Sequence, residues 1–436
     1  MHKTITKPGS VALHVVMTAA NSPAFNRSYF NRCPMRKAAT PAIISSMRTV
    51  LTAERLWDGN RLTSHPQVVL EDGKIESITS RDAAPLPSDA KVLDFPGATL
   101  APAFFDVHIH GAAGHDLMEA TPQALDAITG FLASHGTGSF LATTVTSPLD
   151  VTLRSVEGLA KLLAEPPRPG HARPLGIHLE GPFLSHARRG AQPAEYLLTP
   201  DISIFDRLVD AAEGHVKLIT LAPELPGAVE LTAHATSRGI RVSLGHSDAT
   251  AAETRLAIAA GAVSTTHTFN GMRPLHHHEP GILGVMLTND AMYAELICDG
   301  IHSQPEIVSL WWRAKGPERA ILVTDAMSAT GMPDGEYLLG GFPVLVAKGR
   351  AVVKDAPTDG TLAGSVLTLD RALANFVRFT GATVPQGLRL MTANPAAMTG
   401  LSGQTGAIAV GMRASLVAVD TAGRLVGSVV GGQSVR

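Results

Sequence analysis

An alternation of short apolar segments with helix-like segments constrains the fold of this chain more than any other feature. Eight apolar, β-branched runs begin with "LAPAFFDVHIHG" (100–111) and end with "RAILVTDAMS" (319–328), and helix-like stretches such as "TPQALDAITGFLASHG" follow several of them. Repeated β-then-α units of this kind predict an α/β fold, a (β/α)8 TIM barrel over residues 100–395. In such a barrel the functional residues lie at the C-terminal ends of the strands.

Short strand-like segments occupy both ends of the chain, outside this alternation. Asp72 and Gly73 separate two alternating runs in "QVVLEDGKIESI", which is a hairpin pattern because the tight turn needs positive φ. The C-terminal stretch "GAIAVGMRASLVAVDTAGRLVGSVV" has the same texture. We expect residues 47–99 and 396–436 to form one small β-sandwich domain.

Residues 1–46 differ in composition from the rest of the chain. Asp and Glu are absent before Glu54, whereas Lys and Arg occur repeatedly. A transit peptide is basic and acid-poor in this way. The segment has no steady hydrophobic period, so the simpler interpretation is a disordered extension, or a non-native one translated from a start site upstream of Met47.

The bulk composition excludes several classes of function. The net charge of -2 over 436 residues gives no basic footprint for nucleic acid and no polybasic signal for a membrane surface. Apolar runs also stay shorter than the ~18–20 residues that span a bilayer. Cys33 and Cys298 are the only cysteines, so there is no disulfide framework, and a reducing, cytoplasmic setting fits best.

Metal-binding side chains recur at the ends of the predicted strands. His108 and His110 lie two positions apart in "FFDVHIHG" and therefore share one face of a strand. Glu180 ends "GIHLE", while His246 and His267 follow the strand runs in "SLGHSDA" and "STTHTFN". A barrel brings these ends to one mouth. The sequence therefore predicts a metal site there.

Ligand chemistry assigns roles to these residues. Glu180, His246 and His267 form an N,N,O set that leaves an open position, as a catalytic zinc site requires. His108 and His110 complete a second site that Glu180 bridges.

The sequence also offers a proton acceptor beside these ligands. Asp325 ends the eighth strand in "LVTDAMS", and we expect it to act as a general base that passes a proton from water to the leaving amine. A divalent ion lowers the pKa of its bound water toward ~7. Metal-assisted hydrolysis of an amide-like bond is the predicted reaction.

Several strings of the sequence resemble the amidohydrolase superfamily and, within it, the N-acetylglucosamine-6-phosphate deacetylases. They include "DVHIHGAAGHD", "GIHLEGPFLS", "LGHSDAT", "THTFNGMRPLHHHEPG" and "VTDAMSATG", and the resemblance runs from about residue 50 to 430. It implies hydrolysis of N-acetyl-D-glucosamine 6-phosphate, a small amino-sugar phosphate, to glucosamine 6-phosphate and acetate by a homodimer in amino-sugar catabolism.

The resemblance also implies the roles of the site residues. It makes Glu180, His246 and His267 the core ligands and Asp325 the catalytic acid and base. The histidines of the first motif vary within the family, so their presence here allows one or two divalent ions per subunit. Zinc, iron and manganese all accept such a ligand set, with zinc favoured.

Substrate contacts follow from the resemblance as well. Asn270 and Gly271 match a segment whose backbone amides meet the sugar phosphate, and His302 in "DGIH" matches a substrate-binding histidine. His278 stands where the family often has an arginine that grips the phosphate across a dimer interface, and Arg273 lies near enough in sequence to compensate.

A second departure from the family pattern concerns the reacting acetyl group. Gln192 stands where the family commonly has a histidine. Glutamine can donate a hydrogen bond to a carbonyl oxygen but cannot become a cation. The reaction type survives both departures. The alternatives are a deacetylase for N-acetylgalactosamine 6-phosphate or for an unphosphorylated N-acyl amino sugar, and a non-catalytic scaffold, which would have eroded ligands.

Overall fold

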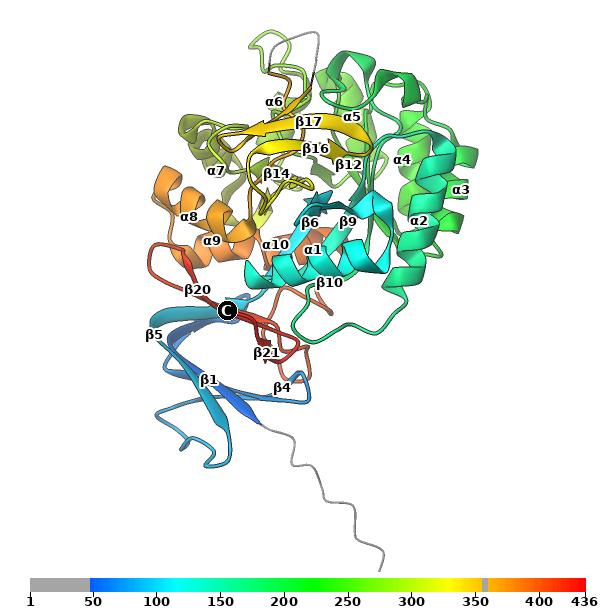
Figure 1. Cartoon of the computed structure of the whole chain (residues 1–436). Helices are drawn as coiled ribbons and strands as arrows, with labels where there is room; N and C mark the ends of the chain where they lie inside the picture. The colour runs from blue at the N-terminus through cyan, green and yellow to red at the C-terminus, as the bar shows by residue number, and fades with distance from the viewer. Residues whose placement is uncertain (1–47, 355–359) are drawn as a thin grey trace, which may run out of the picture. The chain divides into compact units, whose positions relative to one another are not determined.

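A computed structural model of the protein describes residues 48–354 and 360–436 (Figure 1). The predicted N-terminal extension, residues 1–46, lies outside the described residues. None of the helices in the described part of the chain combines the length and the hydropathy that crossing a bilayer requires.

The centre of the described chain is a barrel of parallel strands, as the alternation predicted. Eight strands pair in sequence order, so each lies beside the strand before it. Both faces of these strands are almost entirely buried, which explains why the strand sequences are continuously apolar. The barrel strands are β6 (Phe104–Ile109), β9 (Thr137–Thr144), β10 (Arg173–Glu180), β11 (Val216–Leu221), β12 (Arg241–Leu244), β13 (Ser264–Thr265), β14 (Tyr293–Ile297) and β15 (Ala320–Val323).

One helix after each strand surrounds the barrel (Figure 1). Two further short helices, α9 (Val384–Leu390) and α10 (Ala393–Thr399), follow the last of them. The helices that alternate with the strands are α1 (Pro122–Ser134), α2 (Leu149–Leu163), α3 (Ile202–Ala211), α4 (Ala228–Ser237), α5 (Ala251–Ala259), α6 (Gly281–Thr288), α7 (Pro305–Arg319) and α8 (Leu369–Thr380).

The barrel closes where its first and last strands meet. The backbone N–H of Asp325 donates to the carbonyl of His108 at 2.9 Å, and the N–H of His110 donates to Ala326 at 2.8 Å. Deeper in the same seam, the Thr324 hydroxyl donates to the buried Asp106 carboxyl at 2.5 Å. These bonds bring the first histidine motif beside Asp325, although more than 200 residues separate them in the chain.

The two chain ends contribute strands to one further sheet of eight strands. The predicted hairpin is confirmed, because Asp72 and Gly73 both have positive φ between its strands. β5 runs to Pro102 and leads directly into the barrel. That this sheet is a separate domain stays a prediction. Its strands are β1 (Thr49–Trp57), β2 (Leu62–Ser64), β3 (Pro66–Glu71), β4 (Lys74–Ser80), β5 (Lys91–Pro102), β19 (Leu416–Val419), β20 (Leu425–Val430) and β21 (Gln433–Ser434).

Small antiparallel sheets lie in the loops that follow two barrel strands. β7 (Gly111–Ala112) and β8 (His115–Asp116) follow the first histidine motif. A three-stranded sheet interrupts the chain between β15 and α8, where Figure 1 draws β16 and β17 in yellow; its strands are β16 (Gly335–Leu339), β17 (Phe342–Ala347) and β18 (Arg350–Val353).

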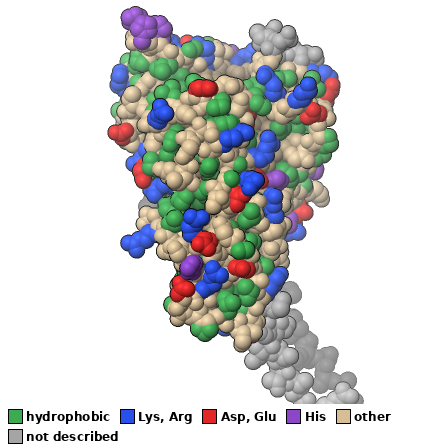
Figure 2. Space-filling view, turned by 90° about the vertical axis from the view of Figure 1, so that its left-hand side faces the viewer, with side chains coloured by type: hydrophobic (Ala, Val, Ile, Leu, Met, Phe, Trp, Pro, Cys, Tyr) green, Lys and Arg blue, Asp and Glu red, His purple; other side chains and the backbone are tan. Residues whose placement is uncertain are grey.

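Charged side chains are mixed on the molecular surface that Figure 2 presents. Lys and Arg alternate there with Asp and Glu, and no single-sign stripe covers this face.

Candidate metal centre

Six side chains from five strand ends converge at the mouth of the barrel. Two groups of possible ligands form there, and within each group the ligand atoms lie within 4.8 Å of one another. We call them the Glu180 set, which consists of Glu180, His246 and His267, and the His108 set, which consists of His108, His110 and Asp325. All six residues are buried, so the centre lies at the floor of the mouth rather than on its rim.

Three of the six residues have an uncommon backbone conformation. His246, His267 and Asp325 have φ of 47°, 30° and 51°, and each follows the last residue of its strand by two positions. Left-handed backbone outside glycine costs about 1–3 kcal/mol per residue and clusters at functional sites. In this protein the left-handed conformation occurs just beyond the ends of three strands, at three of the residues that form the centre.

In the Glu180 set the ligand atoms point toward one another. The Nε2 atoms of His246 and His267 lie 3.1 Å apart, and each lies 3.1 Å from the same carboxyl oxygen of Glu180. The Nδ1 of His246 faces the carbonyl oxygen of Arg188 at 3.1 Å, which fixes the orientation of the ring. Two ligand atoms bound at about 2.0–2.1 Å to a tetrahedral zinc ion lie about 3.3–3.4 Å apart. The spacing of this set therefore suits one divalent ion.

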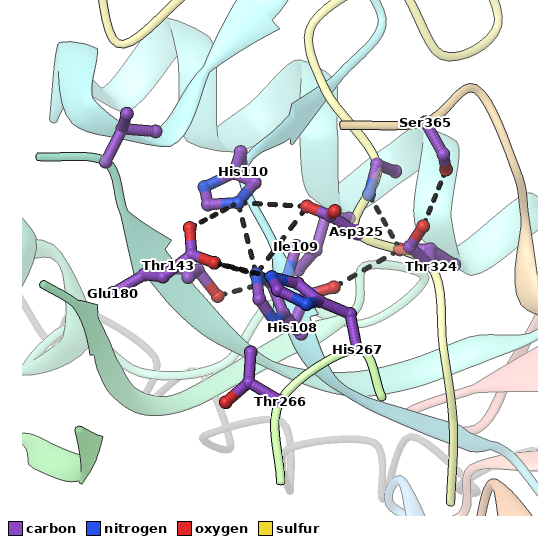
Figure 3. Close-up of polar contacts among 12 residues, drawn as sticks. His108, Ile109, His110, Thr143, Glu180, Thr266, His267, Thr324, Asp325 and Ser365 are labelled. Atoms are coloured by element: carbon purple, nitrogen blue, oxygen red, sulfur yellow. Dashed lines mark hydrogen bonds and ion pairs between the residues drawn. The ribbon is translucent and has the colours of Figure 1, made fainter. Parts of the chain in front are cut away.

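The His108 set has the same kind of geometry (Figure 3). The Nε2 atoms of its two histidines lie 3.2 Å apart. One carboxyl oxygen of Asp325 lies 3.1 Å from His110 Nε2 and 3.6 Å from His108 Nε2. Strand alternation had predicted that the two histidines share a face, and in the structure both direct Nε2 to the same side.

Glu180 contacts both sets. Its Oε1 lies 3.4 Å from His108 Nε2, in addition to the two histidines of its own set, and its Oε2 lies 3.3 Å from His110 Nε2. Gln192 also belongs to this arrangement, because its Nε2 donates to Glu180 Oε2 at 2.7 Å while its Oε1 accepts from the Thr146 backbone at 2.9 Å. The second bond fixes which end of the amide faces the carboxylate.

The electrostatics of the centre favour a cation. Burial is the largest influence on His108 and lowers its pKa, but the carboxylates of Glu180 and Asp325 raise that pKa well above its ordinary value overall. Against the same effect of burial, these two carboxylates raise the pKa of His110 to about 9. Burial raises the pKa of Asp325, yet His108 and His110 lower it overall to about 2. Buried carboxylates that stay ionised need positive charge nearby, which a divalent ion supplies.

A cavity of about 290 Å³ opens above this floor. Glu180, His246, His267, His110 and Asp325 line it together with four predicted substrate contacts, which are Gln192, Asn270, Gly271 and His302. Leu339 and Phe342 of the three-stranded sheet form part of the wall.

Two of these cavity residues are held tightly by their neighbours. His302 Nδ1 faces Asp299 Oδ2 at 2.7 Å. A Cβ at Gly271 would lie 2.8 Å from His246 Nδ1, so only glycine fits beside that ring. Both residues therefore have positions that the surroundings fix before any substrate binds.

Two predicted substrate contacts lie outside the residues that line this cavity. Arg273 donates to the Asp248 carboxylate at 3.1 Å and to the Asp248 carbonyl at 2.7 Å. Arg188 donates to the same carboxylate at 2.7 Å. His278 is exposed, in ring contact with His276 and His277. Within one subunit these side chains do not join the other predicted contacts at the cavity.

Sequence reasoning missed several residues that support the centre. Glu224 accepts from Ser247 and from the Asp248 backbone, and so holds the loop that carries His246. Glu295 lies fully buried beside His108. A charged residue inside the apolar run "YAELI" was a signal that could have revealed the second of these.

Two further titratable residues of the barrel strands are held by neighbours other than the six side chains of the centre. His178 is packed beneath the ligands, with its Nε2 at 2.8 Å from the Thr220 hydroxyl, and burial lowers its pKa well below the ordinary value. Lys217 donates from Nζ to the Gly214 carbonyl at 2.9 Å, just before β11 begins. Among the described residues, no lysine therefore replaces Glu180 between the two sets.

A barrel with two histidine and carboxylate sets at its mouth defines the class of metal-dependent hydrolases. Comparison with protein families matches residues 99–435 to the amidohydrolase family. The chain is 39% identical to the N-acetylgalactosamine-6-phosphate deacetylase of Escherichia coli O157:H7, over 86% of this chain and 96% of that protein. It is 38% identical to the N-acetylglucosamine-6-phosphate deacetylase of Bacillus subtilis, over 83% of this chain and 90% of that protein.

A solved structure gives the same result. The N-acetyl-D-glucosamine-6-phosphate deacetylase of Mycobacterium smegmatis, in a mutant form in complex with N-acetyl-D-glucosamine-6-phosphate, superposes with a TM-score of 0.82 at 34% identity, and the match covers 89% of this chain and 99% of that one. The chain therefore belongs to the amidohydrolase family, whose members depend on divalent metals, and its relatives at this level of identity are amino-sugar-phosphate deacetylases.

Proposed function

We propose that this protein hydrolyses the N-acetyl group of N-acetyl-D-glucosamine 6-phosphate and releases glucosamine 6-phosphate and acetate in amino-sugar catabolism. The observation that carries the proposal is the position of Asp325, whose carboxylate lies 3.1 Å from His110 Nε2 and lines the same cavity as the Glu180 set. The deacetylases to which the chain is similar support the choice of reaction.

The residues of the two sets have distinct roles in this proposal. Glu180, His246 and His267 would hold one divalent ion, and His108 and His110, with Glu180 in contact range of both, would hold a second. Zinc is the favoured metal, while iron and manganese also accept nitrogen and oxygen ligands. A bound divalent ion polarises the acetyl carbonyl and makes a water molecule more acidic.

Asp325 moves the proton. Against the effect of burial, His108 and His110 lower its pKa, so the carboxyl group is ionised at neutral pH. In that form it can accept a proton from the attacking water. The same carboxyl group then donates that proton to the amine nitrogen as the C–N bond breaks. The second proton of the water also passes to the amine, so the products are acetate and the ammonium form of the amino sugar, and atoms and charge balance.

The substrate is oriented by polar groups around the cavity. Gln192 is already fixed by Thr146 and can share its second N–H with the acetyl carbonyl. The backbone amides of Asn270 and Gly271 receive the phosphate, and His302, held by Asp299, binds the sugar. His278 and Arg273 lie outside the cavity of one subunit, so we assign the remaining phosphate contact to His278 of a second copy in a cytoplasmic homodimer.

A second candidate substrate has specific support. The relative that is 39% identical to this chain acts on N-acetylgalactosamine 6-phosphate by its name, while the 38% identical relative acts on the glucosamine compound. These sugars differ only in the configuration of one hydroxyl group. An unphosphorylated N-acyl amino sugar is the third possibility, since His278 replaces a permanent cation with a weak one.

Rates of acetate release from all three compounds test the proposal. We expect kcat/KM to be highest for N-acetylglucosamine 6-phosphate, and treatment with a chelator to remove the activity. A preference for unphosphorylated N-acetylglucosamine would contradict the proposal, and a preference for the galactosamine 6-phosphate would replace the sugar but keep the reaction.

A further inference from the structure

Glu295 is a buried acidic residue that none of the roles above uses. It lies in the middle of β14, between the apolar residues Ala294 and Leu296, and its side chain is 0% exposed. Both of its carboxyl oxygens lack a hydrogen-bond partner among the described residues. A buried carboxyl group without partners lowers stability substantially, so its presence calls for an explanation.

The nearest matching group is a ring nitrogen of His108. His108 Nδ1 is also buried and without a hydrogen-bond partner in the described part of the chain, and it lies 3.6 Å from Glu295 Oε2. The opposite ring nitrogen, Nε2, faces Glu180 and Asp325. The imidazole of His108 therefore spans the gap between the ligand cluster and Glu295.

The neighbouring ring of His178 has partners of its own. His178 packs against His108 with ring centroids 4.8 Å apart, but its own nitrogens face the hydroxyls of Thr143 and Thr220. In the Glu180 set, His246 Nδ1 faces the Arg188 carbonyl. An acceptor behind a ligating histidine fixes the tautomer and raises the basicity of the ligating nitrogen.

Charge balance gives an independent reason for a third carboxyl group. One divalent ion is neutralised by the carboxylates of Glu180 and Asp325. A second ion adds two positive charges to a buried site, where unbalanced charge is costly. Glu295 supplies a further carboxyl group on the Nδ1 side of the His108 ring, whereas the buried Asp106 carboxyl accepts from the His108 backbone N–H.

We propose that Glu295 is a positioning residue for the second metal ion: it accepts a hydrogen bond from His108 Nδ1–H, which directs His108 Nε2 to that ion. The inference rests on the proposed function, because it assumes that the centre binds metal. The gap of 3.6 Å is longer than a formed hydrogen bond. Within the described chain neither group has another hydrogen-bond partner, so both would be free to form this bond when the ion is held.

The test compares metal binding by the full-length protein and its variants. Glu295→Leu removes the acceptor, Glu295→Gln keeps an acceptor oxygen without charge, and Leu296→Val perturbs packing on the same strand as a matched control. Ions per chain are counted at graded free Zn²⁺ concentrations. We expect two ions in the wild-type protein and a second ion that binds about 100-fold more weakly in Glu295→Leu and about tenfold more weakly in Glu295→Gln. The first ion and the control should be unchanged.

The outcomes separate this inference from the proposed function. A wild-type protein that binds no ion and releases no acetate would contradict the proposed function. An active protein with only one ion, unchanged second-ion affinity in Glu295→Gln, or equal weakening of both ions would overturn the inference alone. If Glu295→Leu does not fold, the Glu295→Gln result decides, because that substitution preserves shape.

Discussion

The Glu180 set and the His108 set differ in what they must do besides hold a metal. The Glu180 set contributes two imidazoles and one carboxylate, and the Nε2 atoms of both imidazoles lie close to the same oxygen of that carboxylate. The His108 set includes Asp325, which in the proposed function exchanges a proton and so is not committed fully to an ion. The comparison teaches that similar ligands can have different roles. In the proposed function one set carries the metal that the reaction needs, while the other carries the base and an additional ion.

Loss of a histidine from the Glu180 set should have the largest effect. In His267→Ala we expect the ion of that set to be lost and acetate release to fall to the level of chelator-treated protein, because the carbonyl is no longer polarised. His110→Ala is the matched control, and it should retain one ion and measurable activity. Equal loss in the two variants would erase the distinction between the sets.

Replacement of the base should come next. In Asp325→Asn we expect kcat to fall by about 10²–10⁴-fold, the usual contribution of a positioned proton acceptor, while the Glu180 set keeps its ion. Metal analysis beside steady-state kinetics checks both parts. An Asn variant that retains wild-type kcat would remove Asp325 as the base.

Loss of the Gln192 amide, which contacts Glu180, should have a smaller effect. Gln192→Ala removes the donor that orients the Glu180 carboxylate, and we expect metal affinity to fall by about 10–100-fold. Gln192→His, which restores the residue that the family commonly has, serves as the paired variant. Unchanged affinity in Gln192→Ala would show that the two histidines of the set orient Glu180 sufficiently.

Substitution of His278, the proposed phosphate contact, should give the smallest change in kinetics. In His278→Arg we expect KM for the phosphorylated sugar to fall by about tenfold, because a permanent cation strengthens one hydrogen bond to phosphate. KM for the unphosphorylated sugar is the control and should not move. If neither KM changes, His278 lies away from the phosphate.

The barrel and the convergence at its mouth of the five predicted ligands and Asp325 were predictable because they depend on order along the chain. Strand alternation placed His108 and His110 on one face, and the barrel brought Glu180 and Asp325 to the same end. Strand β13 consists only of Ser264–Thr265. Even so short a strand occupies the position in the sheet that the order along the chain predicted.

Contacts that depend on side-chain direction were not predictable. Gln192 was assigned to the acetyl group, yet its amide also donates to Glu180, a contact that only the loop path decides. Arg273 was expected near the phosphate, but Asp248 engages its guanidinium. Glu295 was overlooked because the sequence does not indicate which side chain contacts an acidic residue inside an apolar run. The structure shows that the ring of His108 lies beside it.

The measurement that tests the central claim most directly is metal content and acetate release in the double variant His108→Gln/His110→Gln. If the Glu180 set and Asp325 carry the reaction, this variant binds one ion per chain and still releases acetate from N-acetylglucosamine 6-phosphate. Loss of all metal, or loss of activity while one ion remains bound, would contradict the account.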